Sequence, residues 1–391
     1  MAERIITAID VGTHTVRVVI AEYVTGAGLP RILGMGRSES RGLRHGYIMN
    51  TLDASRSIRA ALDDAEHAAN VRVREAYISL GGIGLEGTQA RGAAIISRAD
   101  TQIVETDVDR AVRAAEANIP NPANKKIILS VPIEYHIDGK KVFGRPAGMK
   151  GLKLEATVLV VSTLEQHLND LIRAVEEAGV EVIDAMAAPI AASFVALTKA
   201  QKMAGCVLAN IGAETLSIVV YEEGIPISLE VLPHGSTELT NDIALGLRIP
   251  LEEAEMVKLG KGASQFPKKK LNDIVQTRLE DLFDLVNAHL KKIGKHELLP
   301  AGIILTGGGS GIETIEDFAR AAMRLPSKVP SLSVDFASSP RSKKQIKDTS
   351  WFVSYGLCIW GASSERPAAA AESLTDRFAK SVKNIFRQLL P

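Results

Sequence analysis

The sequence predicts an α/β protein of two similar lobes that carries an inserted α+β subdomain. The first observation is the opening stretch, where IITAID, VGTHT and VRVVIAEY have the pattern of strand, tight turn and strand, and RILGMGRSES adds a third strand. The second observation is a repeat at an offset of 200 residues, in which IDVGTHTVRVVI at 9–20 lies over ANIGAETLSIVV at 209–220. Two copies of one strand–turn–strand unit, each followed by mixed α/β sequence, indicate two homologous halves that face each other.

Composition places the chain among soluble globular proteins. Its 391 residues suffice for two or three domains, and 46% hydrophobic with 24% charged residues is ordinary. The formal net charge is zero, so no overall field attracts nucleic acid and we expect no nucleic-acid partner. The sequence shows neither a signal peptide nor a run of about 18 apolar residues, so the body is expected in the cytoplasm. Cys206 and Cys358 have apolar neighbours and are expected to be buried thiols, and no His/Cys cluster has metal-ligand spacing.

The order of elements divides the chain into six parts. A helix is expected at 53–69 with Asp53 as its N-cap, and a second near 106–118 within a proline-punctuated run of short strands. Helical patterns follow at 238–260 and 270–294. The expected parts are 1–82 with 162–203 (first lobe, 1A), 83–161 (inserted subdomain, 1C), 204–235 with 301–362 (second-lobe core, 2A), 236–300 (second-lobe small subdomain, 2B), 363–372 (linker) and 373–391 (amphipathic helix).

The two matched turns have the composition of phosphate-binding loops. Glycine lets backbone N–H groups approach phosphate oxygens closely, and threonine adds a hydroxyl donor. Asp10 ends the first strand and can hold Mg²⁺ through water, since Mg²⁺ prefers oxygen ligands and keeps its waters. The alternative is an ordinary hairpin whose glycine only permits the turn. The candidate residues are Asp10, Gly12, Thr13, His14 and Thr15 in the first turn and Asn210, Gly212, Ala213, Glu214 and Thr215 in the second, with Gly235 beyond it.

Two further features suit the rest of a nucleotide. AGIILTGGGSG is a buried strand that runs into a glycine loop, where Gly307, Gly308 and Gly309 let the chain approach a base and ribose. In PLEEAEMVKLGKG, Glu255 and Lys258 lie at i and i+3 on one helical face. They are candidates for binding ribose hydroxyls, and a solvated ion pair is the alternative.

Taken together, these residues resemble the actin-like ATPase superfamily, in which the order is phosphate turn, second phosphate turn, E-x-x-K helix and glycine loop. The similarity is closer to the bacterial cell-division family FtsA. SVPIEYHIDG with RPAGMKGLKLEA resembles that family's relocated small subdomain, and the resemblance covers about residues 5–362 and the C-terminal helix. The matching positions are Tyr135, Asp138, Gly139, Pro146, Gly148 and Met149.

The resemblance implies a ribonuclease H-like duplicated, two-lobed actin-like fold with ATP and Mg²⁺ between the lobes. It also implies a peripheral protein at the cytoplasmic face of the cell membrane at the division site, polymerising head to tail, binding the C-terminal tail of the tubulin-like protein FtsZ and recruiting later division proteins. The FtsZ tail is expected on the lobe that contains EDLFDLVNAHL, where Arg278 and Asp281 occupy matching positions. Exposed charges on an amphipathic helix are the alternative for this pair.

The second turn departs from the family pattern. Where relatives carry Asp-hydrophobic-Gly-Gly-Gly-Thr, this chain has Asn-Ile-Gly-Ala-Glu-Thr at 210–215, and Gly235-Ser236 replaces a glycine pair. Asn210 keeps an acceptor but lacks the charge that helps to hold Mg²⁺ or orient a water. Glu214 repels phosphate unless it points away. We therefore expect ATP binding with slow or absent turnover.

The last 19 residues, 373–391, predict an amphipathic helix on a membrane surface. Spacings of 4, 4, 3, 1, 3 and 1 place the apolar residues along one stripe, and basic residues occupy the remainder against a single Asp376. Such a helix lies in the interface of anionic lipids because its charges preclude spanning. Packing on the protein's own core is the alternative. The candidate membrane residues are Leu374, Phe378, Val382, Ile385, Phe386, Leu389 and Leu390 on the apolar face and Arg377, Lys380, Lys383 and Arg387 on the basic one.

Three other functions fit parts of the pattern. A sugar or acetate kinase shares the ATP site, but it needs a second-substrate pocket with a carboxylate base, and none is identified in the sequence. A PilM-like or an MreB-like membrane-associated actin relative is the other alternative. The C-terminal lipid helix favours the FtsA-like reading over both, by analogy at the level of the fold.

Overall fold

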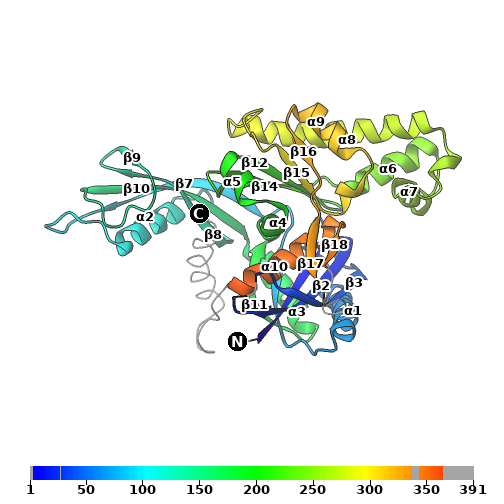
Figure 1. The fold of residues 1–391 in the computed structure, drawn as a ribbon, viewed down its shortest axis with the longest axis horizontal. Helices are drawn as coiled ribbons and strands as arrows, with labels where there is room; N and C mark the ends of the chain where they lie inside the picture. The colour runs from blue at the N-terminus through cyan, green and yellow to red at the C-terminus, as the bar shows by residue number, and fades with distance from the viewer. Residues whose placement is uncertain (1–2, 27, 337–342, 364–391) are drawn as a thin grey trace.

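The computed structural model describes residues 3–26, 28–336 and 343–363, which form two lobes around two five-stranded sheets (Figure 1). The sheet of the first lobe has the order β11-β6-β1-β2-β3. Its first three strands form an antiparallel meander, and β6 and β11 add parallel to β1. The strands are β1 (Glu3–Val11), β2 (Thr15–Val24), β3 (Arg31–Glu39), β6 (Glu75–Leu80) and β11 (Glu181–Ala187).

The sheet of the second lobe repeats this topology in the order β14-β13-β12-β15-β16. β12, β13 and β14 are again an antiparallel meander, and β15 and β16 again add parallel. The registers also agree, because Val11 pairs with Val16 and Ile211 pairs with Leu216. The duplicated two-lobed α/β fold predicted from the repeat is therefore confirmed. The strands are β12 (Cys206–Ile211), β13 (Leu216–Glu222), β14 (Ile225–Leu232), β15 (Ile303–Thr306) and β16 (Ser327–Lys328).

Helix α1 (Thr51–Ala69) covers the meander of the first lobe and begins earlier than the sequence predicts. Its N-cap is Asn50, whose Oδ1 accepts from the backbone N–H groups of Leu52 and Asp53 at 3.1 and 3.2 Å. The prediction of Asp53 as N-cap was therefore wrong, since asparagine is an equally good acceptor and stands one turn earlier. The helix packs directly on β3, where a Cβ at Gly36 would overlap the backbone oxygen of Ala61.

A separate α+β unit extends from the first lobe as an arm (Figure 1). Its sheet has the order β7-β10-β8-β9, and α2 packs on one face of it. Apolar side chains of α2 and the sheet, among them Ala111 and Val158, form a core of their own. The elements are β7 (Glu86–Ile95), α2 (Glu105–Ala117), β8 (Lys125–Ile137), β9 (Lys140–Val142) and β10 (Lys153–Leu164).

A second arm, made of helices, extends from the other side of the second lobe (Figure 1). The sequence predicts one helical stretch at 238–260, whereas the structure has α6 (Ser236–Leu247) and α7 (Leu251–Lys258). The break follows from Arg248, which adopts the left-handed conformation at φ 59°, and from Pro250, which stands at the N-cap of α7. The arm is completed by η1 (Ala263–Gln265) and the long helix α8 (Lys268–Lys292) and has its own small core around Leu239 and Ile243.

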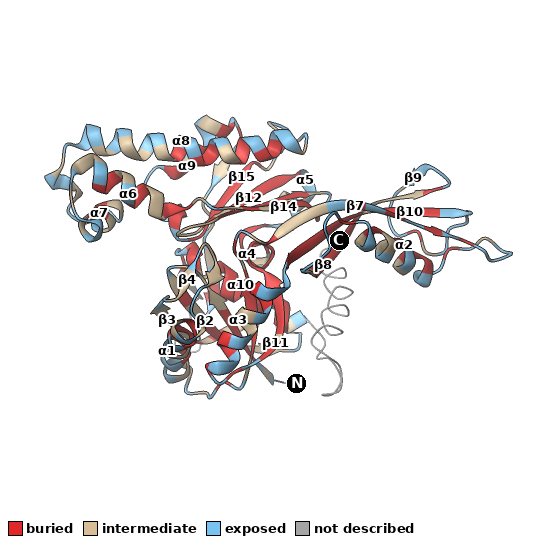
Figure 2. Cartoon of the chain, turned by 180° about the vertical axis from the view of Figure 1, so that it is seen from behind, coloured by how far each residue is buried: buried red, intermediate tan, exposed pale blue. Residues whose placement is uncertain are grey.

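Helices α4 (Ala188–Ala196) and α10 (Phe352–Ser363) pack on each other and contact strands of both lobes, so that one buried apolar cluster is continuous through the molecule (Figure 2). A Cβ at Gly356 would overlap the backbone oxygen of Ala191, so the two helices approach at backbone distance. Cys206 and Cys358 are free thiols within this core, which confirms that they are buried. The remaining elements are β4 (Leu43–Arg44), β5 (Tyr47–Ile48), α3 (Glu165–Glu177), α5 (Lys199–Ala204), η2 (Gly308–Gly311), α9 (Ile315–Met323), β17 (Leu332–Asp335), β18 (Lys343–Ile346) and η3 (Thr349–Trp351).

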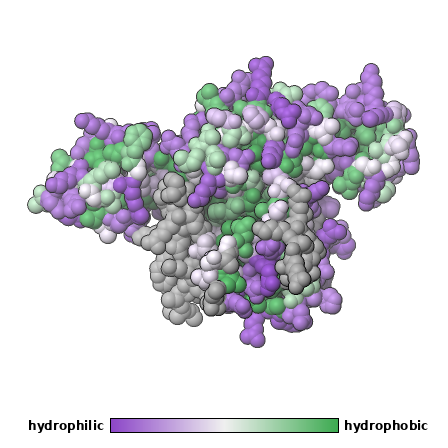
Figure 3. Space-filling model, viewed as in Figure 1, coloured by the Kyte–Doolittle hydropathy of each residue, from purple (hydrophilic) through white to green (hydrophobic). Residues whose placement is uncertain are grey.

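The surface in view is mainly polar, with hydrophobic side chains in patches between hydrophilic ones (Figure 3). Two of the most exposed apolar side chains lie on opposite arms: Phe143 follows β9 and Leu245 lies on α6, each 79% exposed. Within the described ranges, no helix combines the length and apolar character needed to cross a bilayer. Apart from Ser363, the last residue of α10, the expected linker and C-terminal helix lie outside the described residues. The residue ranges proposed for the six parts stay a prediction.

Candidate functional site

The two glycine turns are equivalent in structure as well as in sequence. The backbone N–H of Gly212 donates to the carbonyl of Thr215 at 2.8 Å and closes the second turn. A Cβ at Gly212 would lie 3.1 Å from that carbonyl oxygen, and a Cβ at Gly12 would lie 2.9 Å from the carbonyl oxygen of Thr15. Both positions therefore favour glycine.

The tip of the β4–β5 hairpin lies between the two turns. His45 and Gly46 are the two tip residues, with φ of 48° and 82°, which leaves two consecutive backbone N–H groups outside the hairpin. Gly46 donates to Oγ1 of Thr13 at 3.1 Å, and His45 donates to the side-chain Oε2 of Glu214 at 2.6 Å. The hairpin tip thus contacts the first turn within its own lobe and the second turn in the other lobe.

Sequence reasoning did not single out this hairpin. The available signal was the dipeptide His45-Gly46 before the short apolar run at 47–49, since a two-residue tip with both φ values positive favours glycine at its second position. What the sequence does not reveal is the distance spanned by the contact, because Glu214 lies 169 residues further along the chain.

Asp10 is the next-to-last residue of β1, just before the first turn. Its Oδ1 accepts a hydrogen bond from Oγ of Ser79 on the neighbouring strand β6 at 2.6 Å. Burial raises the pKa of Asp10 above its usual value, although the Ser79 hydrogen bond and the charge of Arg17 act in the opposite direction. A carboxylate whose charge is penalised by burial gains when a cation approaches, which suits the expected role of Asp10 towards hydrated Mg²⁺.

No group of three or more His, Cys, Asp or Glu side chains is arranged as a metal cage in the described part of the chain. One carboxylate with a serine partner fits a cation that keeps most of its waters and is also held by phosphates. Asp10 is the residue that would hold Mg²⁺ in this way, and this role stays a prediction.

The second turn accepts hydrogen bonds from the start of helix α6. The backbone N–H groups of Ser236 and Thr237 donate to the carbonyls of Gly212 and Ala213, both at 2.9 Å. A Cβ at Gly235 would overlap the carbonyl oxygen of Ala213. Gly235 is therefore needed for the packing of the turn on α6, whatever it contributes to a ligand.

The glycine loop after β15 packs on the second turn, and its three glycines differ. Gly307 has φ 86° and ψ 172°, and a Cβ there would overlap Oδ1 of Asn210 and the carbonyl oxygen of Ile211. Gly309 lies against the side chain of Ile211, whereas a Cβ at Gly308 would meet nothing within 4 Å. The structure thus brings Asn210, the second turn and the glycine loop together. Gly308 is the member of the trio that leaves room for another molecule.

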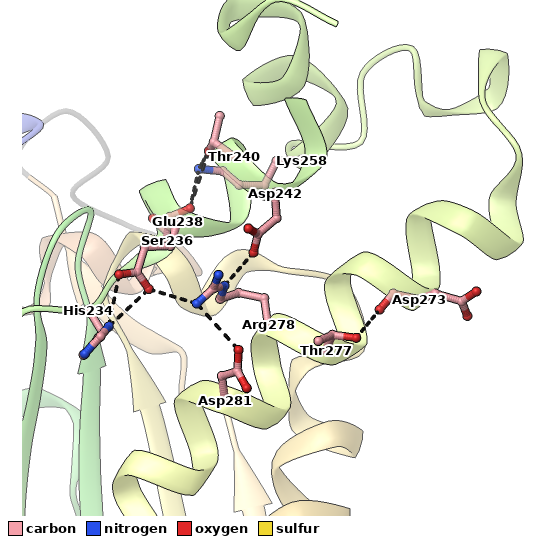
Figure 4. Close-up of polar contacts among 10 residues, drawn as sticks. All are labelled: His234, Ser236, Glu238, Thr240, Asp242, Lys258, Asp273, Thr277, Arg278 and Asp281. Atoms are coloured by element: carbon pink, nitrogen blue, oxygen red, sulfur yellow. Dashed lines mark hydrogen bonds and ion pairs between the residues drawn. The ribbon is translucent and has the colours of Figure 1, made fainter. Parts of the chain in front are cut away.

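Glu255 and Lys258 form the ion pair expected from their spacing, with Nζ and Oε2 2.6 Å apart. Oε2 of Glu255 also accepts from Oγ1 of Thr240 at 2.6 Å. Lys258 Nζ donates to the same hydroxyl at 2.9 Å (Figure 4). Burial favours the neutral acid, but the hydrogen bonds from Lys258 and Thr240 prevail and lower the pKa of Glu255, with a further contribution from His14 of the first turn.

Arg278 on α8 lies in a cluster of acidic side chains (Figure 4). Its Nε donates to Asp242 at 2.6 Å, and Nη1 lies 3.3 Å from Glu238 and 3.7 Å from Asp281. The hydrogen bond that Arg278 donates to Asp242 and the charges of the surrounding acids raise the pKa of Arg278. Arg278 thus ties α8 to α6, and Asp281 remains 61% exposed beside it. Contact of the two with a partner stays a prediction.

The predicted membrane residues between 374 and 390 lie outside the described part of the chain. All other predicted site residues are described. The phosphate, glycine-loop and Glu255–Lys258 residues gather on the two turns and the elements that contact them, and Arg278 and Asp281 belong to the helical arm.

The repeated sheet, the paired turns and the glycine loop define the class of two-lobed actin-like proteins. Solved structures agree with this fold. The PilM–PilN type IV pilus biogenesis complex matches with a TM-score of 0.68 at 17% identity, covering 92% of this chain and 99% of the other. The ethanolamine utilization protein EutJ of Carboxydothermus hydrogenoformans matches with a TM-score of 0.55 at 14% identity, covering 92% and 90%.

Sequence comparison identifies the family within this class. The family model "Cell division protein FtsA" matches residues 207–356, and "SHS2 domain inserted in FTSA" matches residues 82–162. The cell division protein FtsA of Pseudomonas aeruginosa is 30% identical over 345 residues, covering 83% of this chain and 82% of that protein. FtsA of Bacillus subtilis is 29% identical over 346 residues, covering 83% and 78%. The chain belongs to the FtsA family of bacterial cell-division proteins.

Proposed function

We propose that this chain is an ATP-binding division protein that polymerises at the cytoplasmic face of the membrane, tethers the FtsZ ring to it and recruits later division proteins. The observation that carries the nucleotide part is the contact of both glycine turns with one hairpin tip, His45-Gly46. A ligand held by both turns would therefore affect the relative position of the two lobes. Membership of the FtsA family favours this function over a PilM-like or MreB-like role and over a small-molecule kinase.

The residues fit a nucleotide in a defined arrangement. The backbones of Gly12 and Gly212 face the phosphates, and Thr13 and Thr15 with Thr215 add hydroxyls. We propose that a base and ribose lie beside Gly308, where an added Cβ would meet nothing within 4 Å, and that the Glu255–Lys258 pair binds ribose hydroxyls. Bound Mg²⁺ neutralises phosphate charge. Because Asn210 is uncharged where the first turn has Asp10, this chain is expected to bind ATP with little hydrolysis.

Calorimetry with purified protein in millimolar Mg²⁺ tests the nucleotide site. We expect uptake of ADP or ATP, loss of binding in Gly12→Ala, and unchanged binding in Glu177→Ala, which alters an exposed side chain at the end of α3. Absence of uptake of both nucleotides by the unaltered protein refutes the proposal. A phosphate-release assay that shows brisk steady-state turnover refutes the expectation of slow hydrolysis.

Attachment to the membrane is proposed for the amphipathic segment 373–391. Each basic residue near anionic lipid contributes about 1 kcal/mol, and a single helix binds reversibly, so polymerisation strengthens attachment through avidity. Exposed Phe143 and Leu245 on opposite arms support contacts between copies along a filament. Electron microscopy on anionic lipid monolayers with and without ATP tests assembly and attachment together.

The helix is tested by Phe378→Glu, which places a charge on its apolar face. We expect this variant to lose co-sedimentation with anionic vesicles, whereas Asn384→Glu, the same change in charge on the polar face, retains most of it. Equal co-sedimentation of the two variants would contradict the membrane role of the stripe.

The FtsZ tail is proposed to contact Arg278 and Asp281 on α8. Arg278 pairs with Asp242 and Glu238, so a carboxylate of the tail would have to compete with these two acids for the guanidinium. Asp281 is exposed and accepts from donors of the tail.

A further inference from the structure

Glu214 of the second turn contacts the opposite lobe through His45. Its Oε2 accepts the backbone N–H of His45 at 2.6 Å, and its own carbonyl oxygen lies 3.3 Å from Nδ1 of the same histidine. The ring Nδ1 is 4.0 Å from the carboxylate, and the two side chains are 34% and 29% exposed. Both the backbone and the side chain of Glu214 are therefore directed at one residue of the opposite lobe.

The position of Glu214 within its turn places a negative charge where an anionic ligand could otherwise bind. At the offset of 200 residues Glu214 corresponds to His14, so the two turns carry an acid and a base at equivalent places. The N–H of His45 is a backbone donor beside the N–H of Gly46, and consecutive backbone amides at a turn are a common binding place for anions. The carboxylate of Glu214 accepts the hydrogen bond of the His45 N–H, so a negatively charged group of the protein itself already uses this donor.

We propose that Glu214 is a specificity-determining residue that makes the site prefer a nucleoside diphosphate to a triphosphate. With two phosphates on the turns, the carboxylate stays on His45 and the lobes remain joined. A third phosphate reaching towards the hairpin tip brings like charge against the carboxylate, which has to leave His45 before the ligand fits. This inference rests on the proposed nucleotide site, and it assigns to that site a choice between ligands.

The test compares the unaltered protein with Glu214→Gly, Glu214→Gln and the control Glu177→Gln, which removes the same charge from an exposed position on α3. Dissociation constants for Mg·ADP and Mg·ATP are measured by calorimetry on each, after thermal melting has shown that each is folded. We expect the unaltered protein and the control to bind ADP about tenfold more tightly than ATP or better. Both Glu214 variants should gain ATP affinity until the ratio approaches one, with the ADP constant changed less than about threefold. The glutamine keeps the shape of the side chain and an acceptor for His45, so any gain of ATP affinity in Glu214→Gln is due to the loss of the charge.

Hydrogen exchange without nucleotide tests the contact itself. The peptide containing residues 43–48 should exchange faster in Glu214→Gly than in the unaltered protein, and Glu177→Gln should leave it unchanged. An ATP-to-ADP ratio that stays the same in the Glu214 variants while both nucleotides bind overturns this inference and leaves the proposed function standing. Unaltered exchange at 43–48 also overturns it. Failure of every protein to bind either nucleotide refutes the proposed function together with this inference.

Discussion

Gly307 and Gly308 are neighbours in one loop, yet the structure predicts opposite consequences of replacing them with alanine. At Gly307 the backbone has φ 86° and ψ 172°, a region that costs a residue with a Cβ about 1–3 kcal/mol. The new methyl would also overlap the carbonyl oxygen of Ile211 and Oδ1 of Asn210. Overpacking of this kind typically costs a further ~1–3 kcal/mol. Gly307→Ala should therefore destabilise the second lobe by about 2–6 kcal/mol.

For a lobe of this size, each kcal/mol lowers the melting temperature by about 2–4 °C, so Gly307→Ala should melt at least about 4 °C lower. Gly308→Ala meets nothing within 4 Å and has no positive φ, so its melting temperature should stay within about 1 °C. Its effect should appear in nucleotide affinity, because the methyl fills the room proposed for the base and ribose. Differential scanning fluorimetry and calorimetry on both variants separate the two roles. Equal melting temperatures for the two variants would refute the steric reasoning, and unchanged affinity in Gly308→Ala would refute the assignment of the loop.

Two further predictions concern the acidic and basic side chains. Arg278→Ala should weaken binding of an FtsZ C-terminal peptide by about tenfold in fluorescence anisotropy. Arg320→Ala, whose exposed partner is Asp317, should leave it unchanged, and equal affinities would remove Arg278 from the partner site. Because burial raises the pKa of Asp10, its carboxyl contributes stability that is present below the usual value of 3.8 and is lost as the pH rises through the folded-state pKa. Asp10→Asn should therefore raise the melting temperature of the nucleotide-free protein more at pH 8 than at pH 4.5 while weakening Mg·nucleotide binding. A lower melting temperature at pH 8 than the unaltered protein would contradict this.

The fold was predictable because the repeat carries both pattern and register. Once 9–20 is laid over 209–220, the pairing of Val11 with Val16 predicts that of Ile211 with Leu216, since turns of the same length give the same register. Local signals were weaker. Asn50 and Asp53 are equivalent as cap acceptors in sequence, and only the observed hydrogen bonds to Leu52 and Asp53 separate them.

The candidate site was predictable in its residue types but not in its contacts. Glycines on matched turns indicate phosphate binding, yet the sequence does not reveal that Gly235 and Gly307 are required mainly for packing on the second turn. The hairpin tip at His45 was missed because β4 and β5 are two residues each, too short to produce an alternating pattern. Its significance arises from a contact across 169 residues, which no local pattern encodes.

The two lobes have the same sheet topology but differ in the charged side chains at their glycine turns. In the first, Asp10 lies near the end of its strand with a carboxylate that accepts from Ser79, and a cation bound there, as proposed, would relieve the cost of burying the charge. In the second, the equivalent Asn210 is neutral and lies against Gly307. The negative charge is instead that of Glu214, which belongs to the second turn and accepts a hydrogen bond from the hairpin tip at His45. If Asp10 holds the cation and Glu214 repels a further phosphate, as we propose, the site is suited to holding a nucleotide. Among the described residues, the second lobe has the neutral Asn210 in place of a second acid that would orient a water for attack. For a protein proposed to join a filament to a membrane, a ligand that stays bound and links the lobes is more useful than one that is rapidly consumed.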